Sequence, residues 1–298
     1  EGRRTRDDNK KITGYTMKRS IILLAGIVAM FWTVSCDKLD EPFAIKKEGG
    51  DTTTAMKRKV LLEDYTGHKC VNCPSAAKAA HAIEAASNGG LIIIAVHAGF
   101  FATPGSAPFT ADYRTAAGNE WNTEFGINAW PAGIINRTPY EGALVLYDYG
   151  QWGNAINAQM ALPQEANIGI SSDYNAGSRE LQVTLSTKFL APLEGTYNLT
   201  VCITEDSIVS AQKNSDTLVG TVPVIDNYIF LDMLRANING TWGEELTSSA
   251  DTTMTYTKSY SYTLDPAWVA EHCHIVAFVS RTDSKAVIQA EKKAVTTE

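Results

Sequence analysis

The stretch that decides the fold is VLLEDYTGHKCVNCP, residues 60–74. Its first part, residues 60–65, is rich in valine and leucine and predicts a buried strand. A short turn then leads to Cys70 and Cys73, which are separated by two residues. Residues 75–87 are rich in alanine, with apolar side chains at helical spacing, and the glycines that follow can end a helix. The pattern is a strand, a sharp turn and a helix that begins at a pair of cysteines.

The position of this cysteine pair favours redox chemistry. At the start of a helix, unpaired backbone N–H groups and the helix dipole stabilise a thiolate over a thiol. We therefore predict that Cys70, as the first and more exposed residue, attacks a partner disulfide, and that Cys73 resolves the mixed disulfide. The alternatives are half of a zinc site or two structural cysteines. A structural zinc site needs four ligands, and no second Cys-x-x-Cys or matching histidine pair follows, so neither a metal nor a cofactor is predicted.

The remaining sequence predicts two folded domains after a short N-terminal region. Over residues 57–162, strands and helices alternate, which predicts an α/β domain. Beyond residue 162, segments with alternating apolar and polar residues predict an all-β, immunoglobulin-like sandwich over residues 163–298. Residues 226–245 fit this pattern less well, and we expect a short helix near residues 230–236. The further elements predicted are strands at 91–96, 134–136, 167–173, 180–189, 196–205, 255–264 and 275–281 and helices at 110–125 and 151–160.

The N-terminal region carries the features of a lipoprotein export signal. Lys18 and Arg19 precede an apolar run at residues 21–32, which is shorter than the ~20 residues of a membrane span and suits a secretory signal. The run ends just before Cys36 in a segment that resembles a lipobox, where the cysteine is diacylated and becomes the mature N-terminus. A simple signal peptide or a weak anchor helix are the alternatives. Residues 1–35 are then an upstream extension plus signal peptide, and residues 36–56 a lipid-anchored tether.

Composition restricts the partners and the redox compartment. The net charge of −7 argues against binding to nucleic acid, which is a polyanion. Export places the cysteines in an oxidising compartment, where Cys202 and Cys273 could pair across the sandwich and contribute roughly 4 kcal/mol. Two separate buried thiols are the alternative. His272 and His274 would share one strand face but lack a third ligand, so we expect packed or exposed side chains there.

Two further motifs show that the first domain resembles the thioredoxin superfamily. Asp64 lies six residues before Cys70, and GINAWPAGII at residues 126–135 is similar to the segment that holds the cis-proline of thioredoxins. The resemblance implies that Asp64 takes a proton from the resolving cysteine and that Pro131 is cis and shapes the substrate groove. An ordinary acid at a strand end and a trans loop proline are the alternatives. Lys69 replaces the tryptophan of thioredoxins, so the direction of electron flow stays open.

The chain as a whole resembles the Omp28-related outer-membrane lipoproteins of Bacteroidota. The resemblance rests on EDYTG at residues 63–67, CxxCP at residues 70–74, the segment from Trp130 to Arg137, and HCHIVAFV at residues 272–279. It implies a thioredoxin-like domain followed by an all-β domain, a lipid anchor in the outer membrane, and envelope or surface proteins as partners.

Two functions follow from these resemblances. The first is thiol-disulfide exchange on envelope proteins, and the second is non-catalytic, adhesin-like binding with the thioredoxin fold as a scaffold. An exposed Cys70 beside a cis-Pro131 favours the first function. A Cys70 that is covered by the C-terminal half of the chain favours the second.

Overall fold

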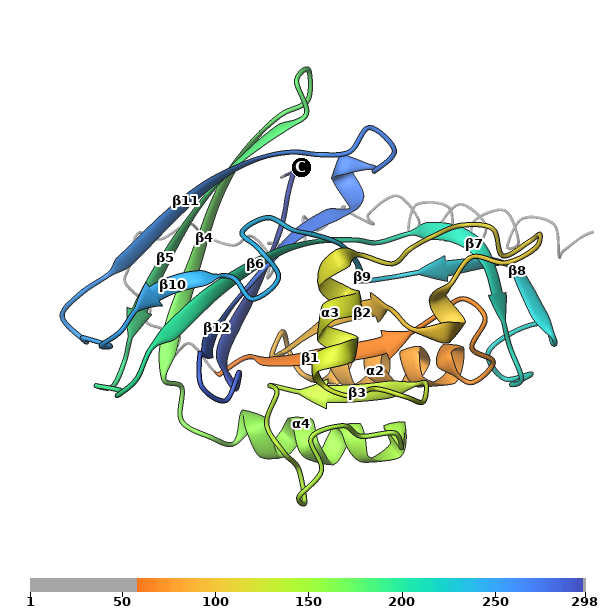
Figure 1. The fold of residues 1–298 in the computed structure, drawn as a ribbon, viewed down its shortest axis with the longest axis horizontal. Coiled ribbons are helices and arrows are strands. Elements are labelled where there is room, and N and C mark those ends of the chain that lie inside the picture. The colour runs from red at the N-terminus through yellow and green to blue at the C-terminus, as the bar shows by residue number, and fades with distance from the viewer. Residues whose placement is uncertain (1–57, 297–298) are drawn as a thin grey trace, which may run out of the picture. The chain divides into compact units, whose positions relative to one another are not determined.

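The computed structural model describes residues 58–296, and its centre is an eight-stranded mixed sheet (Figure 1). The strand order is β13-β12-β6-β9-β2-β1-β3, and β10 pairs with β6. The strands are β1 (Val60–Thr66), β2 (Leu91–His97), β3 (Ala132–Ile135), β4 (Ala166–Asn175), β5 (Glu180–Phe189), β6 (Tyr197–Glu205), β7 (Ile208–Lys213), β8 (Val224–Phe230), β9 (Met233–Asn237), β10 (Glu244–Thr247), β11 (Tyr256–Thr263), β12 (Cys273–Arg281) and β13 (Val287–Ala294). The helices are α2 (Cys73–Ala86), α3 (Ala116–Glu124) and α4 (Trp152–Met160), with short 3-10 turns at Phe100–Ala102, Tyr149–Gln151 and Ala270–His272.

Strands β1 and β2 are parallel neighbours covered on both faces. On one face, Val60 and Leu62 pack with residues of α2 and α4. On the other face, Leu61 and Tyr65 pack with Trp121 of α3. Coverage on both sides explains why these strands are continuous apolar runs, as is usual for parallel strands between layers of helices. The predicted strand–helix–strand order is present at this end of the sheet.

The second half of the chain adds strands to the same sheet and a separate three-stranded sheet. Strands β6 and β12 are antiparallel and almost completely buried. Strands β11, β5 and β4 form the three-stranded sheet, and β5 alternates buried apolar with exposed polar residues. The apolar faces of the two sheets share a core that includes Leu185, Phe189, Leu199 and Ile275, as expected for sheet-on-sheet packing.

The predicted boundary at residues 162 and 163 does not separate two independent domains. Strand β9 joins the halves, because it pairs with β6 on one side and with β2 on the other. One core also contains residues of both halves, including Leu61, Ile94, Cys202 and Phe278. An α/β thioredoxin-like domain followed by a separate immunoglobulin-like sandwich was predicted. The described chain instead has mixed sheets, mostly β structure and a few helices in one compact unit.

Several local predictions also need correction. The short helix expected near residues 230–236 is wrong, since β8 and β9 occupy this segment and meet at Asp232, whose φ is 53°. Helix α3 begins at Ala116, six residues later than predicted, because the Thr115 side chain caps it by accepting from Gly118 N at 2.9 Å. The signal sequence, Cys36 and the tether lie outside the described residues.

Candidate functional site

The cysteine pair lies in a tight turn between β1 and α2. Cys70 and Cys73 form a disulfide, and Cys70 N donates to Gly67 O at 2.9 Å to close the turn. A Cβ atom on Gly67 would lie 2.5–2.7 Å from backbone atoms of Phe101 and Ala102, so only glycine fits there. The chain forms this turn because a glycine at this point lets the loop after β2 approach the end of β1.

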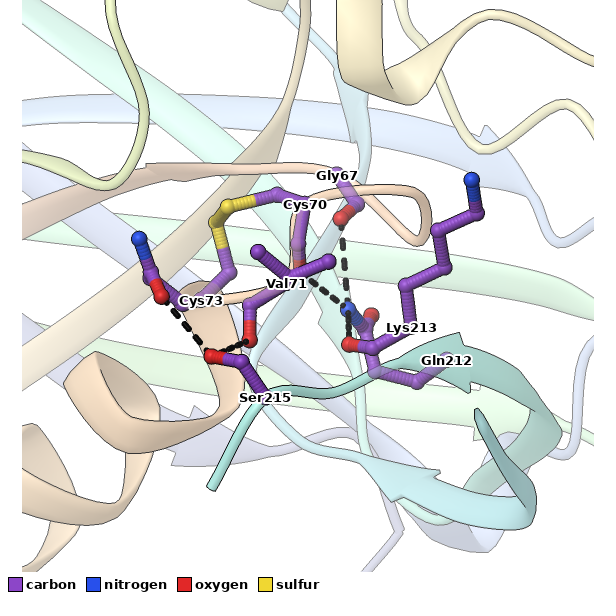
Figure 2. Close-up of a disulfide and its surroundings, with 8 residues drawn as sticks. Gly67, Cys70, Val71, Cys73, Gln212, Lys213 and Ser215 are labelled. Atoms are coloured by element: carbon purple, nitrogen blue, oxygen red, sulfur yellow. Dashed lines mark hydrogen bonds between the residues drawn. A yellow bond between two sulfur atoms is a disulfide. The ribbon is translucent and has the colours of Figure 1, made fainter. Parts of the chain in front are cut away.

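Cys70 is not exposed, so that prediction is wrong. Cys70 and Cys73 are both only 2% exposed. The hairpin of β7 and β8 comes from the second half of the chain, and Gln212 near the end of β7 and Ser215 just after it lie against the disulfide turn (Figure 2). Gln212 Nε2 donates to Cys70 O at 2.8 Å, and Ser215 N donates to Val71 O at 3.0 Å. A segment about 140 residues away in sequence therefore binds the backbone of the turn, while Val71, between the cysteines, is 41% exposed.

Further hydrogen bonds hold the hairpin to the turn. Lys213 N donates to His68 O at 2.8 Å. Ser215 Oγ contacts Asn72 Oδ1 at 2.9 Å and Val71 O at 3.1 Å. Backbone and side-chain bonds thus hold the hairpin against both ends of the turn, and Cys70 itself is only 2% exposed.

Asp64 faces a small cavity below the disulfide. The cavity has a volume of about 30 Å³, and its lining includes Asp64, Cys73, His81 and His97. Asp64 Oδ1 and both ring nitrogens of His97 have no hydrogen-bond partner within residues 58–296. A polar cavity of this size can hold about one water molecule. The structure thus brings the predicted acid and the resolving cysteine to one enclosed space.

Burial changes the protonation of these groups. It raises the pKa of Asp64 to about 7, while the charge of His81 opposes this change and that of Asp232 adds to it. Burial also lowers the pKa of His97 to about 3, so this ring is neutral. Asp64 can therefore exchange a proton near neutral pH, which an acid at an exposed strand end would not do.

The Trp130–Pro131 peptide bond is cis, as predicted. Ala132, the next residue, lies opposite Tyr65 of β1, so Pro131 is at the end of β1 from which the disulfide turn departs. The Trp130 ring packs edge-on against Phe101 at 5.8 Å, and Phe101 O accepts from Lys69 N at 3.1 Å. Pro131 is therefore connected to the turn through packed neighbours, and its role in a substrate groove stays a prediction.

Cys202 and Cys273 do not pair, so the predicted structural disulfide is wrong. Both are free, completely buried thiols. Cys202 contributes to the core shared with β1 and β2, whereas Cys273 contributes to the core below the three-stranded sheet. The side chains thus point to opposite faces of the large sheet, where no disulfide can join them. Burial raises the pKa of both thiols, which makes them unreactive.

A buried ion pair next to the site was missed in the sequence. Arg137 donates to both carboxylate oxygens of Glu63, at 2.7 and 2.9 Å, and both side chains are at most 1% exposed. The guanidinium also lies 4.8–5.4 Å from the centres of four aromatic rings, those of Trp121, Phe125, Trp242 and Phe278. An acid in the middle of a buried strand was the available signal, because such a group needs a partner.

One group of side chains has the spacing of metal ligands. His81, Glu84 and Asp232 each offer one donor atom, and these atoms lie within 4.8 Å of one another. No metal site was predicted from the sequence, in which Asp232 is about 150 residues from the other two. His272 and His274 do not belong to this group, although His274 Nδ1 lies 3.5 Å from Asp206 Oδ2.

Comparison with known proteins identifies the family. A family model described as outer membrane protein Omp28 matches residues 118–298. The chain belongs to the Omp28 family. This result confirms the resemblance found in the sequence and the predicted location in the outer membrane. No curated protein matches this chain.

Solved structures show which fold the Omp28 family protein shares. HBP35 of Porphyromonas gingivalis has a TM-score of 0.59 at 15% identity over 80% of this chain and 76% of its own. A domain of the outer membrane lipoprotein Omp28 from Porphyromonas gingivalis is 21% identical over 45% of this chain and 91% of its own, with a TM-score of 0.31. A protein from Agrobacterium tumefaciens is 14% identical over 82% and 97%, with a TM-score of 0.47. The likeness to HBP35 supports a common fold.

The described part of the Omp28 family protein has no helix that is both long and apolar enough to cross a membrane.

Proposed function

We propose that this Omp28 family protein is a non-catalytic binding protein of the outer membrane. In this proposal the thioredoxin-like unit of β1, α2 and β2 is a scaffold, and Cys70–Cys73 is a structural crosslink within it. The observation that carries the proposal is the position of the β7–β8 hairpin over the disulfide turn.

The position of the β7–β8 hairpin opposes catalysis, because thiol-disulfide exchange requires a thiolate to approach a sulfur directly. Here Cys70 is 2% exposed, and opening the site would break hydrogen bonds made by Gln212, Lys213 and Ser215. At about 1 kcal/mol for each of four such bonds, opening costs roughly 4 kcal/mol, and about one molecule in a thousand is open at a time.

Envelope or surface proteins are the proposed partners. The hairpin and the loop beside it expose large apolar side chains, namely those of Phe100 (69% exposed), Val209 (59%), Leu218 (81%) and Ile229 (56%). Val209 and Ile229 are directly opposite each other in the hairpin, and such a continuous apolar surface is typical of protein contact sites. The proposal includes a lipid anchor at Cys36, tested by whether Cys36→Ala abolishes incorporation of labelled fatty acid in cells.

Disulfide reactivity tests the non-catalytic role. The full chain in detergent is assayed for turnover in insulin reduction and for the rate at which dithiothreitol reduces its disulfide. We expect no turnover, and a slow reduction that becomes at least tenfold faster in the double variant Gln212→Ala, Ser215→Ala. The matched control is Gln182→Ala, Ser261→Ala, two exposed residues of the three-stranded sheet. Turnover by the parent protein, or equal reduction rates in parent and hairpin variant, would overturn the proposal.

A specific observation favours a second function, thiol-disulfide exchange after the hairpin moves aside. Asp64, with a pKa of about 7, shares the cavity with Cys73, and a structural crosslink has no need of such an acid. In the reduced protein, Cys70 thiolate would attack a partner disulfide and release one partner thiolate. Cys73 would pass its proton to Asp64 and attack the Cys70 sulfur, which releases the second partner thiolate and restores the disulfide. An envelope dithiol must then supply two electrons for the next cycle.

Trapping distinguishes the two functions. A Cys73→Ser variant cannot resolve a mixed disulfide, so an exchange enzyme would accumulate covalent complexes with envelope proteins on Cys70. Capture of such complexes in cells, and their absence when Cys70 is also replaced by serine, would establish the second function. A chain that binds partners without covalent capture supports the first.

A further inference from the structure

Three donor side chains, those of His81, Glu84 and Asp232, form a cluster in which His81 also lines the cavity that contains Asp64. His81 and Glu84 are three residues apart on α2 and therefore lie on the same face of the helix. Asp232 comes from the connection between β8 and β9 and is 3% exposed. No step of the proposed function uses these three residues.

The distances within this cluster suit a first-row divalent metal ion. His81 Nδ1 lies 3.2 Å from Glu84 Oε2 and 3.7 Å from Asp232 Oδ2. In a tetrahedral zinc site, with bonds of about 2.0–2.2 Å, neighbouring donor atoms are about 3.3–3.6 Å apart. All three donor atoms lie within 4.8 Å of one another, so an ion could sit between them once the side chains adjust.

The buried ligand is held in place by its surroundings. Asp232 O accepts from Ala95 N of β2 at 2.8 Å, and Asp232 N donates to Asp206 Oδ1 at 2.6 Å. Lys292 Nζ binds the other carboxylate oxygen, Oδ1, which leaves Oδ2 directed at His81. Such outer contacts orient the ligands of metal sites and raise metal affinity.

The charges around the cluster also favour a divalent cation. Glu84, Asp232 and Asp206 contribute three carboxylates, and Lys292 contributes one ammonium group, so two negative charges remain without compensation when these groups are ionised. His274, which also faces Asp206, is kept mainly neutral because burial lowers its pKa. A protonated His81 would compensate one of the two charges, and a divalent cation would compensate both.

Solvent can reach the cluster from one side. The side chains of His81 and Glu84 are 28% and 32% exposed, so an ion can enter, and water can supply the fourth ligand. One imidazole nitrogen with two carboxylate oxygens is a donor set that Zn²⁺ accepts readily.

We propose that His81, Glu84 and Asp232 form a binding site for a divalent transition-metal ion, with Zn²⁺ as the ion that fits best. The site has three protein ligands and one open position, and it borders the cavity that contains Asp64.

Metal titration tests this site directly. Zn²⁺ is titrated by calorimetry into the oxidised full chain after accessible thiols have been alkylated, so that cysteine sulfur cannot compete. We expect one ion per chain, and an affinity lowered at least tenfold in His81→Ala and in Glu84→Gln. Co²⁺ as a spectroscopic probe should give the visible absorption of a tetrahedral site in the parent and lose it in His81→Ala.

The matched controls are His272→Ala and Glu271→Gln, which remove the same types of side chain from the 3-10 turn Ala270–His272. Both should bind Zn²⁺ as the parent does, and circular dichroism should show an unchanged fold in all variants. Because Glu84 is partly exposed, its variant remains informative if His81→Ala fails to fold. No binding to the parent, or equal affinity in parent and Glu84→Gln, would overturn the proposal and leave an ordinary histidine–carboxylate ion pair.

Discussion

Glu63 and Asp64 are neighbours on β1, and both are completely or almost completely buried, yet their surroundings are opposite. Glu63 points to the α3 face and is held by two hydrogen bonds from Arg137. Asp64 points to the α2 face, where Oδ1 has no hydrogen-bond partner among residues 58–296 and burial raises the pKa to about 7. The face of the strand that each acid occupies decides whether a cation lies next to it.

This difference separates a structural role from a chemical one. A buried carboxylate can remain ionised when a cation compensates it, and such a pair contributes to a defined packing arrangement. A buried carboxylate without a cation becomes a weak acid that can hold a proton near neutral pH. The α3 side of β1 is therefore a closed structural core, and the α2 side keeps groups that can exchange protons or bind an ion.

The largest effect is expected from Arg137→Met, which leaves Glu63 buried without a cation. We expect the free energy of unfolding to fall by about 3–5 kcal/mol in urea unfolding experiments. The double variant Glu63→Leu, Arg137→Met should recover most of this loss. Arg281→Met serves as the control, since its guanidinium lies 5.2 Å from the Tyr197 ring centre at a partly exposed position. A loss below 1 kcal/mol for Arg137→Met would mean that the two acids do not differ as described.

The next effect concerns Asp64→Asn and depends on pH. The folded protein holds the Asp64 proton up to a pH of about 7, whereas an unfolded chain releases it near pH 4. The free energy of unfolding of the parent should therefore decrease as the pH rises from about 4 to about 7. Asparagine cannot ionise, so burying it carries no cost of burying a charge. The variant should therefore be more stable than the parent by up to about 4 kcal/mol at pH 8, and equally stable near pH 4. Unfolding of both proteins at each pH measures the effect, with exposed Asp173→Asn as control. A pH-independent difference would contradict an uncompensated Asp64.

A smaller effect is expected when the disulfide is removed. Cys70 and Cys73 enclose a loop of only four residues, so the chain-entropy estimate gives a loss of about 2 kcal/mol for the double serine variant. Thermal unfolding of the oxidised parent, the reduced parent and the variant provides the comparison. If reduction makes the protein more stable, the disulfide is an oxidant rather than a crosslink, and the α2 side of β1 serves exchange chemistry.

The smallest effect is expected at the start of α3, the helix that brings Trp121 onto Arg137. Thr115→Ala removes the hydrogen bond from Gly118 N to the capping side chain and should cost about 1 kcal/mol. Thr123→Ala is the control, because this hydroxyl only bonds to Asn119 O in the same helix and such bonds add little stability. If the two substitutions lower the free energy of unfolding in urea equally, the Thr115 cap does not stabilise the helix that packs Trp121 against Arg137.

Local pattern was sufficient for the elements around the dithiol. Strands β1 and β2 and helix α2 begin and end within two residues of their predicted bounds, since apolar periodicity and helix-end residues act over a few positions. The hairpin of β7 and β8 was not predicted. Its exposed face carries apolar residues such as Val209 and Ile229, which weakens the alternation that normally marks a half-buried strand.

Some members of the site were also predictable, but their surroundings were not. The resemblance to thioredoxins pointed to both Asp64 and Pro131. The proposed metal-binding group was not predicted, because Asp232 reaches His81 only through the packing of the large sheet. Cys202 and Cys273 could not be assigned to faces, because a sequence does not show which side of a buried strand meets which core.

The amino-acid sequence by itself determined that a strand leads into a cysteine pair at the start of a helix and that the chain resembles an outer-membrane family. Those properties depend on neighbouring residues and on motifs that are read in order. Only the tertiary structure decided that Cys70 is covered, that Glu63 is paired and that Asp64 is not. Exposure and charge compensation depend on groups 70 to 170 positions away, and these become neighbours only when the sheet assembles.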